Sequence, residues 1–418
     1  MKSLFIILLS IFYLAQAQEF AQVFFRHGQR LPTNYLTFPN EHLDLSSIKD
    51  LDKGELTSAG IQQSYTLGQN LHEQYSKLVG SVYKSANLVV YSGVDNRTVA
   101  SASALLAGLF PPTPAQTWNA ELPWLPIPVF AEEVLDDVSF GILDNCPYYV
   151  KNTFNVSSDR AIFDKYSKLA EKLSNQTGVP IYDLDRLQKV IDGIISRRFL
   201  TNLLPLPKWA DDPVFVLKMK AVLDQIHSQY IQLLMPQSGA WHFDWLVGNF
   251  DDFVNNRTKH KMVLYSGHDT NMMTLGLYLN ISTVNETLQP TASYLAFELS
   301  RSPFYDDFLV KVFLQNKLNG TRKRLDIGWC EEPCKYSEFR QLRQRTTLRD
   351  FDALCKQLDV RQDLYGGLAS AFIILSVLLL VALIAALVSC QNWRKRYERL
   401  ANEEQQPLLT HRQVVVEQ

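Results

Sequence analysis

Arg26-His27-Gly28-Gln29-Arg30-Leu31-Pro32 is the stretch that decides the fold of this chain, and it directly follows the apolar run Phe20–Phe25. The apolar run is typical of a short buried strand. The glycine allows a sharp turn at the end of the strand, and the proline prevents the turn from continuing as a helix. Two neighbouring guanidinium groups repel each other unless an anion neutralises them, and their planar forks suit phosphate. A histidine between them can act as a nucleophile. The stretch predicts an anion site; a solvated basic turn is the alternative.

Three further motifs follow in order along the chain. The first is Leu56-Thr57-Ser58-Ala59-Gly60. The second, Asp95-Asn96-Arg97-Thr98, follows the strand-like run Leu88–Tyr91. The third, Tyr265-Ser266-Gly267-His268-Asp269-Thr270, is at the end of the strand-like run Met262–Tyr265. Helix-like segments follow the last two, over 96–109 and 270–279. Ligands of open α/β sheets bind beyond the carboxyl ends of strands, so we expect these motifs to meet there. Alone, Arg97 could brace a helix and His268-Asp269 could be an ordinary helix N-cap.

The four ordered motifs resemble those of the histidine acid phosphatases, the branch of the histidine phosphatase superfamily that carries Arg-His-Gly-x-Arg-x-Pro. The resemblance extends from about residue 20 to about residue 355. It implies an α/β fold with a mixed, mostly parallel sheet flanked by helices, and a helical insert subdomain. It also implies hydrolysis of phosphate monoesters at acidic pH through a phosphohistidine, with no metal and no cofactor.

The resemblance assigns a role to each motif residue. His27 would be the nucleophile and Asp269 the acid that protonates the leaving alcohol. Phosphate would be bound by Arg26, Arg30, Arg97 and His268. A free aspartic acid titrates near pH ~3.9, so an acid that must hold its proton favours an acidic compartment. The other histidines fit no partner pattern and are expected at the surface or in packing: His42, His72, His227, His242 and His260.

Two alternatives to an acid phosphatase remain open. Asn271 completes a His-Asp-Thr-Asn string that is usual in phytases, so an inositol-phosphate phosphatase is one of them. The other is an inactive, receptor-like ectodomain. A missing nucleophile or acid would favour the inactive form, and neither is missing. Assays with p-nitrophenyl phosphate and phytate would separate the three.

Both ends of the chain predict a single-pass type I membrane protein. Residues 1–17 have the apolar run and the Ala-Gln-Ala site of a signal peptide. Residues 18–365 would form the lumenal or extracellular phosphatase domain, with a helical insert at about 145–250. Residues 366–390 carry no charge and are long enough to span a bilayer, and the basic residues that follow mark 391–418 as a cytosolic tail.

Cysteines and glycosylation sequons agree with export. Four cysteines of the exported region allow three pairings; the short spacing of Cys330 and Cys334 favours a local bridge, which leaves Cys146 with Cys355. The family resemblance implies the same two bridges, and zinc binding is the alternative for the local pair. Candidate glycosylation sites are Asn155, Asn175, Asn256, Asn280, Asn285 and Asn319. Asn96 is also in a sequon, but a glycan beside Arg97 would obstruct the site, so we expect little use of it.

The tail contains two short sorting patterns. Tyr397 with Leu400 fits a tyrosine signal, and Glu404 with Leu408 and Leu409 fits an acidic dileucine signal. Extended peptides of this kind are bound by adaptor proteins, which predicts clathrin-adaptor binding and delivery to endosomes and lysosomes. A plasma-membrane enzyme with a solvated tail is the alternative. The formal net charge of −2 gives no sign of a nucleic-acid partner, and a homodimer is expected from the resemblance alone.

Overall fold

The structure is a computed structural model that describes residues 18–39, 41, 46, 52–136, 156–200, 204–345 and 348–404. The chain divides into two compact units, residues 1–355 and 356–418. The predicted signal peptide and the dileucine residues Leu408 and Leu409 lie outside the described residues, so both stay predictions.

A seven-stranded mixed sheet forms the centre of the first unit, in the order β3-β2-β4-β1-β5-β6-β7. Strands β1 (Phe20–Arg26), β2 (Leu88–Ser92), β3 (Phe130–Ala131) and β4 (Met262–Gly267) pair in parallel. The other half is antiparallel: β5 (Tyr294–Arg301), β6 (Phe308–Gln315) and β7 (Lys323–Leu325). The mixed sheet flanked by helices confirms the predicted α/β fold class, but the sheet is half rather than mostly parallel. All three strands predicted from the motifs lie in the parallel half.

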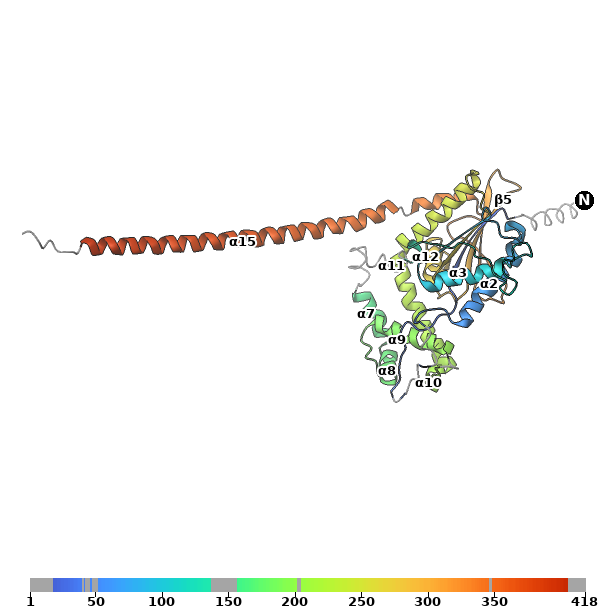
Figure 1. Cartoon of the computed structure of the whole chain (residues 1–418), viewed down its shortest axis with the longest axis horizontal. Helices are drawn as coiled ribbons and strands as arrows, with labels where there is room; N and C mark the ends of the chain where they lie inside the picture. Colours follow the sequence, from blue (N-terminus) through green and yellow to red (C-terminus); the bar gives the residue numbers. More distant parts are fainter. Residues whose placement is uncertain are drawn as a thin grey trace, which may run out of the picture. The chain divides into compact units, whose positions relative to one another are not determined.

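Helices cover both faces of this sheet (Figure 1). Alternate residues of β1 point to opposite faces, as a strand requires. Ala21, Val23 and Phe25 pack with α2 (Ser58–Val79) and α3 (Asn96–Leu109). Phe20 and Phe24 pack with the second half of α11 (Pro213–Val254) and with α12 (Asp269–Tyr278). The sheet is therefore buried on both sides, and only the strand ends are free to form a site.

Glycines allow α2 and α3 to pack with almost no gap. A Cβ added at Gly68 on α2 would lie 1.9 Å from the Leu105 carbonyl oxygen, and one at Gly108 on α3 would lie 2.1 Å from that of Tyr65. Both contacts are to backbone atoms, which no side-chain rotation can move aside. This close pair fixes the position of α3, whose first turn carries Arg97.

The helical insert has its own apolar core. It comprises α7 (Val156–Lys165), α8 (Ser167–Thr177), α9 (Leu184–Arg197), the 3₁₀ turn η3 (Arg198–Leu200), α10 (Lys208–Asp211) and the first half of α11. Helices α7 and α8 meet at Tyr166. Helix α11 continues across Pro236 to Val254, and its second half belongs to the core of the sheet.

Short elements complete the first unit: α4 (Val134–Asp136), α13 (Ser282–Asn285), α14 (Tyr336–Gln341) and the 3₁₀ turn η4 (Leu342–Arg345). The predicted bridge between Cys330 and Cys334 is present. Cys146 lies outside the described residues, so its pairing with Cys355 stays a prediction. The side chains of four sequon residues are exposed, namely Asn175, Asn256, Asn280 and Asn319; Asn96 is also exposed, and Asn285 is half-buried. Asn155 lies outside the described residues.

The C-terminal helix α15 spans Leu348–Glu404. Within the described residues one stretch is long and apolar enough to cross a membrane, Ser370–Leu400. Its large apolar side chains are exposed rather than packed in a core, with Ile373 at 66% and Leu379 at 63%. An apolar surface of this length has no favourable place in water, which agrees with the membrane span predicted at 366–390.

Candidate active site

The parallel strands bring together the motifs that follow β1, β2 and β4, at the carboxyl ends of these strands. Arg26 at the end of β1 lies level with Gly267 at the end of β4, and Ser92 of β2 lies level with Ser266 of β4. His27 follows β1, the Asp95–Arg97 turn follows β2, and His268 and Asp269 follow β4. The rings of His27 and His268 have centroids 5.5 Å apart. Segments 240 residues apart in sequence therefore form one site, as the carboxyl ends of parallel strands predict.

His27 is held in the form that can attack. Its side chain is buried, and its Nδ1 lies 2.7 Å from the carbonyl oxygen of Gly28. A carbonyl oxygen only accepts, so Nδ1 carries the proton and Nε2 keeps its lone pair. Burial, followed by the positive charges of Arg26, His268 and Arg97, holds the pKa of His27 well below its usual range. The imidazole is therefore a neutral base even in mild acid.

Glycines also allow the loop of His27 to pack directly against the backbone at the start of α2. A Cβ at Gly28 would lie 2.2 Å from the carbonyl oxygen of Gly60, at the start of α2. A Cβ at Gly60 would in turn lie 2.0 Å from the carbonyl oxygen of Gln29. The Gly28 N–H donates to Ser101 Oγ on α3 at 3.0 Å. The residue types at 28 and 60 thus have one structural explanation, the contact of the His27 loop with α2.

Three arginines from two segments, 26–32 and the first turn of α3, lie close enough together for two of them to affect the pKa of Arg97. Burial lowers the pKa of Arg97, and Arg30 and Arg26 lower it further, against the opposing effect of Asp95 and Asp136. Each arginine has a carboxylate partner: Arg26 with Asp269 at 3.2 Å, Arg30 with both oxygens of Asp192 at 3.0 and 3.1 Å, and Arg97 with Asp95. Three clustered cations can bind an anion with several oxygens if it replaces these carboxylate contacts.

Asp269 begins α12 and is buried against this cluster. One of its carboxylate oxygens, Oδ1, accepts from the Thr270 N–H at 3.0 Å. The other, Oδ2, is buried and forms the ion pair with Arg26 Nη2 at 3.2 Å. Burial acts to raise the pKa of Asp269, but the charges of Arg26, His227 and His268 outweigh it and hold the pKa below its usual value. A bound phosphate would bring negative charge beside this carboxyl and so raise its pKa.

His268 is fixed at both ring nitrogens. Its side chain accepts from the backbone N–H of Asn271 in a capping box at the start of α12, and Asn271 Oδ1 accepts from the His268 N–H at 2.7 Å. The other ring nitrogen, Nε2, lies 2.5 Å from Asp136 Oδ1 and 3.5 Å from Asp95 Oδ2. Asp136 only accepts when it is ionised, so Nε2 carries a proton and donates to Asp136.

Three residues of the site were not predicted from the sequence. Asp136 and Asp192 belong to no motif, and only the tertiary structure brings them to His268 and Arg30. His227 on α11 was expected in packing or at the surface. Instead, its charge and that of Asp269 affect each other's pKa, and its Nε2 lies 3.2 Å from Gln188 Nε2 on α9. Nothing in their local sequence distinguishes these three residues from surface acids or a core histidine.

Asn271 serves the helix rather than the ligand. It is 1% exposed, and its side-chain amide lies 2.8 Å from the Leu135 carbonyl oxygen and 3.1 Å from His242 Nε2. A Cβ at Gly267 would lie 2.4 Å from Asn271 Oδ1. The side chain therefore caps α12 beneath the site. His242 is buried beside it, so of the two places expected for it, surface or packing, it takes the second.

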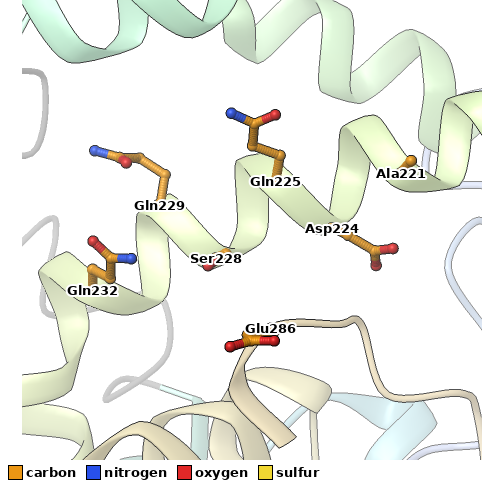
Figure 2. Close-up of a pocket in the computed structure, with 7 residues that line it drawn as sticks. All are labelled: Ala221, Asp224, Gln225, Ser228, Gln229, Gln232 and Glu286. Atoms are coloured by element: carbon orange, nitrogen blue, oxygen red, sulfur yellow. The ribbon is translucent and has the colours of Figure 1, made fainter. Parts of the chain in front are cut away.

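Two other features near the site suit a phosphate less well. Ligand atoms of Asp95, Asp136 and His268 lie within 4.8 Å of one another and could hold a metal ion, but Asp95 is already paired with Arg97. A cavity of about 480 Å³ lies along α11, with Glu286 on the facing segment (Figure 2). Its lining includes Asp224 and Glu286 and no cation, so it would repel a phosphate.

Comparison with known proteins gives concordant matches. Residues 19–315 match the Histidine phosphatase superfamily (branch 2). Lysosomal acid phosphatase from Xenopus laevis is 27% identical over 398 residues, which cover 91% of this chain and 90% of that protein. Testicular acid phosphatase from Mus musculus is 30% identical over 344 residues, which cover 77% and 78%. Among solved structures, a phytase from Citrobacter braakii has a TM-score of 0.55 at 16% identity and covers 78% of this chain and 97% of its own. At that identity the structural likeness shows the fold alone.

Proposed function

The chain belongs to branch 2 of the histidine phosphatase superfamily, and from this premise we propose that it is an acid phosphatase, an enzyme that hydrolyses phosphate monoesters. The relatives named lysosomal, prostatic and testicular acid phosphatases support this activity. The observation that carries the proposal is the convergence of Arg26, Arg30 and Arg97 around a neutral His27 whose Nε2 keeps its lone pair.

The first chemical step transfers the phosphoryl group to His27. The lone pair of His27 Nε2 attacks phosphorus as the bond from phosphorus to the ester oxygen breaks. The three arginines stabilise the charge on the non-bridging oxygens, in the role that a metal ion has in other phosphatases. Asp269 gives its proton to the leaving oxygen, so the alcohol departs neutral and the carboxylate is left ionised.

The second step returns the enzyme to its starting state. Water attacks phosphorus of the phosphohistidine, the bond from phosphorus to nitrogen breaks, and Asp269 accepts the proton of the water. Orthophosphate leaves, and His27 regains its lone pair. Because Asp269 must be protonated in the first step and its pKa is held low by Arg26, His227 and His268, turnover should be fastest in acid.

A substrate panel on the purified exported domain tests this function. We expect hydrolysis of p-nitrophenyl phosphate and of small alkyl phosphates at acidic pH, unaffected by a metal chelator. Phytate is the arm that tests the inositol-phosphate alternative. The Asn271 that resembles phytases has a capping role here, so it gives no support to phytate as a substrate. Failure on every monoester across the pH range would contradict the proposal and favour an inactive ectodomain.

The location of the enzyme follows from its relatives and its apolar helix. Lysosomal acid phosphatases among the relatives, together with the stretch Ser370–Leu400, fit a membrane-anchored lysosomal protein. We infer in addition the finer topology: a cleaved signal peptide over 1–17, a lumenal domain over 18–365 and a cytosolic tail over 391–418. Protease protection of the tail, but not of the domain, at the surface of intact cells tests this orientation.

A homodimer is the last part of the proposal. Trp118 is 59% exposed and Phe130 52% exposed on the segment that ends in β3, an edge strand of the sheet. An open strand edge beside exposed aromatic side chains is a surface that proteins usually cover. Light scattering of the purified exported domain should give twice the monomer mass. Trp118→Ser should reduce that mass to the monomer value without loss of folding.

A further inference from the structure

One carboxylate connects two separate parts of the phosphate site. Asp136 follows β3, and its side chain is 13% exposed. Its Oδ1 accepts from His268 Nε2 at 2.5 Å. Its Oδ2 accepts from the backbone N–H groups of Val94 at 2.5 Å and Asp95 at 3.2 Å. Asp136 therefore binds the start of α12 on one side and the turn from β2 to α3 on the other.

The contact with His268 determines both the orientation and the tautomer of the ring. The Asn271 N–H contacts one ring nitrogen, and the other, Nε2, directs its proton to Asp136. A histidine held at both nitrogens cannot flip or change tautomer without losing a hydrogen bond. The Nε2–H of His268 is thus fixed beside Asp136, and the Asp95 oxygen 3.5 Å from Nε2 marks the place of a second acceptor.

The contact with the β2–α3 turn depends on Gly93. A Cβ at Gly93 would lie 2.3 Å from Asp136 Oδ1 and 2.6 Å from Oδ2, so only glycine allows the carboxylate to approach this backbone. The Gly93 N–H also donates to the Ser266 carbonyl oxygen of β4 at 2.9 Å. Arg97 lies two residues beyond Asp95, in the first turn of α3. The position of Arg97 is therefore coupled to that of Asp136.

The neighbouring Asp95 lies close to the same histidine, but its side chain is more exposed and is not anchored to the backbone within the described residues. Its Oδ2 pairs with Arg97 and also lies 3.5 Å from His268 Nε2, so one anionic oxygen bridges two phosphate-binding donors. The Asp95 side chain is 40% exposed and can rotate into solvent, whereas Asp136 is anchored by two backbone N–H groups. The Asp95 oxygen thus occupies a place that a phosphate oxygen can take.

We propose that Asp136 is a positioning residue for phosphate binding, which fixes His268 relative to the turn that carries Arg97. Asp95 occupies the place of a phosphate oxygen between His268 and Arg97, and phosphate displaces it. The proposal rests on the phosphatase function proposed above. Burial acts to raise the pKa of Asp136, but the hydrogen bond and charge of His268 and the two backbone N–H groups hold it below its usual value. Asp136 therefore stays ionised in the acidic range where the enzyme works.

The test compares single variants of Asp136 and Asp95, which both lie beside His268. Asp136→Ala should lower kcat/KM for p-nitrophenyl phosphate about tenfold or more and raise the inhibition constant of orthophosphate, as the loss of a hydrogen bond to a charged group predicts. Asp95→Ala should leave that inhibition constant unchanged or lower it, because a competitor is removed. Glu133→Gln, an exposed acid in the same segment, should change neither value. If Asp95→Ala raised the inhibition constant of orthophosphate as much as Asp136→Ala does, the distinction between the two residues would be overturned.

A double-mutant cycle separates positioning from general support of the fold. If Asp136 acts through His268, Asp136→Ala should cost much less activity in a His268→Ala background than in wild type. Equal costs in both backgrounds would overturn the proposal. Asp136→Asn, which keeps the side-chain size, replaces Ala if the melting temperature of Asp136→Ala falls below the assay range. An inactive wild type would instead contradict the phosphatase function itself, so the two failures are distinguishable.

Discussion

Adding a single methyl group at Gly28 should damage both the fold and the chemistry. In Gly28→Ala the new Cβ would lie 2.2 Å from the Gly60 carbonyl oxygen and 2.7 Å from its carbonyl carbon. Both are backbone atoms at the start of α2, and α2 is itself held against α3 by the Gly68 and Gly108 contacts. The loop of His27 must therefore move, because α2 has little room to do so.

The size of the movement follows from the contact distance. Opening 2.2 Å to an ordinary contact of 3.4 Å requires a shift of about 1.2 Å. Overpacking of this kind costs about 1–3 kcal/mol, and a backbone contact on both sides places this case near the upper value. A misplacement of about 1 Å can reduce turnover about a hundredfold. We therefore expect a loss of about 3 kcal/mol of stability and about a hundredfold loss of kcat.

Two matched glycine variants separate these effects. Gly68→Ala meets the Leu105 carbonyl oxygen at 1.9 Å but lies away from His27, so it should lower stability and leave kcat of the folded enzyme nearly unchanged. Gly248→Ala, in the interior of α11, finds Arg343 Nη2 at 3.9 Å as its nearest atom. Alanine is the better helix former there, so stability should rise by about 0.5–1 kcal/mol.

Chemical denaturation followed by circular dichroism, together with kcat for p-nitrophenyl phosphate, measures both quantities on the three purified variants. The order of stability should be Gly248→Ala above wild type, with Gly28→Ala and Gly68→Ala below it. Only in Gly28→Ala should kcat fall by more than the unfolded fraction of the enzyme explains. Wild-type stability and turnover in Gly28→Ala would refute the close contact between the His27 loop and α2.

Three further predictions concern the acid, its neighbour and the tail. Asp269→Asn should lose about 10²–10⁴-fold in kcat on alkyl phosphates and much less on p-nitrophenyl phosphate, whose leaving group needs little protonation; equal losses would assign Asp269 a structural role. His227→Gln removes a charge that lowers the pKa of Asp269, so that pKa should rise and the basic limb of the kcat–pH profile should move to higher pH; His260→Gln is the control, and an unmoved limb would contradict the coupling. Leu408→Ala and Leu409→Ala combined with Tyr397→Ala should raise the enzyme level at the cell surface, and an unchanged level would favour a plasma-membrane enzyme.

The parallel strands and the motif residues could be predicted because their signals are local. Phe20–Phe25 is an apolar run that ends in glycine and proline, and the helix predicted over 96–109 is α3 with the same bounds. The order of the motifs along the chain then predicted that they would meet at the ends of parallel strands.

Other parts of the site depend on contacts that no local pattern records. Asp136 contacts Gly93 and His268, which follow β2 and β4, and Asp192 contacts Arg30 through the packing of α9. His227 depends on the rotation of α11, a helix whose continuation across Pro236 contradicts the local preference of proline for helix ends. Tertiary packing decides such positions, and a single sequence does not contain that information in readable form.

The central claim is that His27 carries the phosphoryl group, and trapping the intermediate tests it most directly. The purified exported domain would be mixed with a phosphate monoester at acidic pH for a few turnovers and denatured rapidly in alkali, which preserves phosphohistidine. Peptide mass spectrometry should find phosphate on the peptide that contains His27, and none in His27→Ala, which should be folded and inactive. Phosphate on another residue, or near-normal turnover in His27→Ala, would contradict the claim.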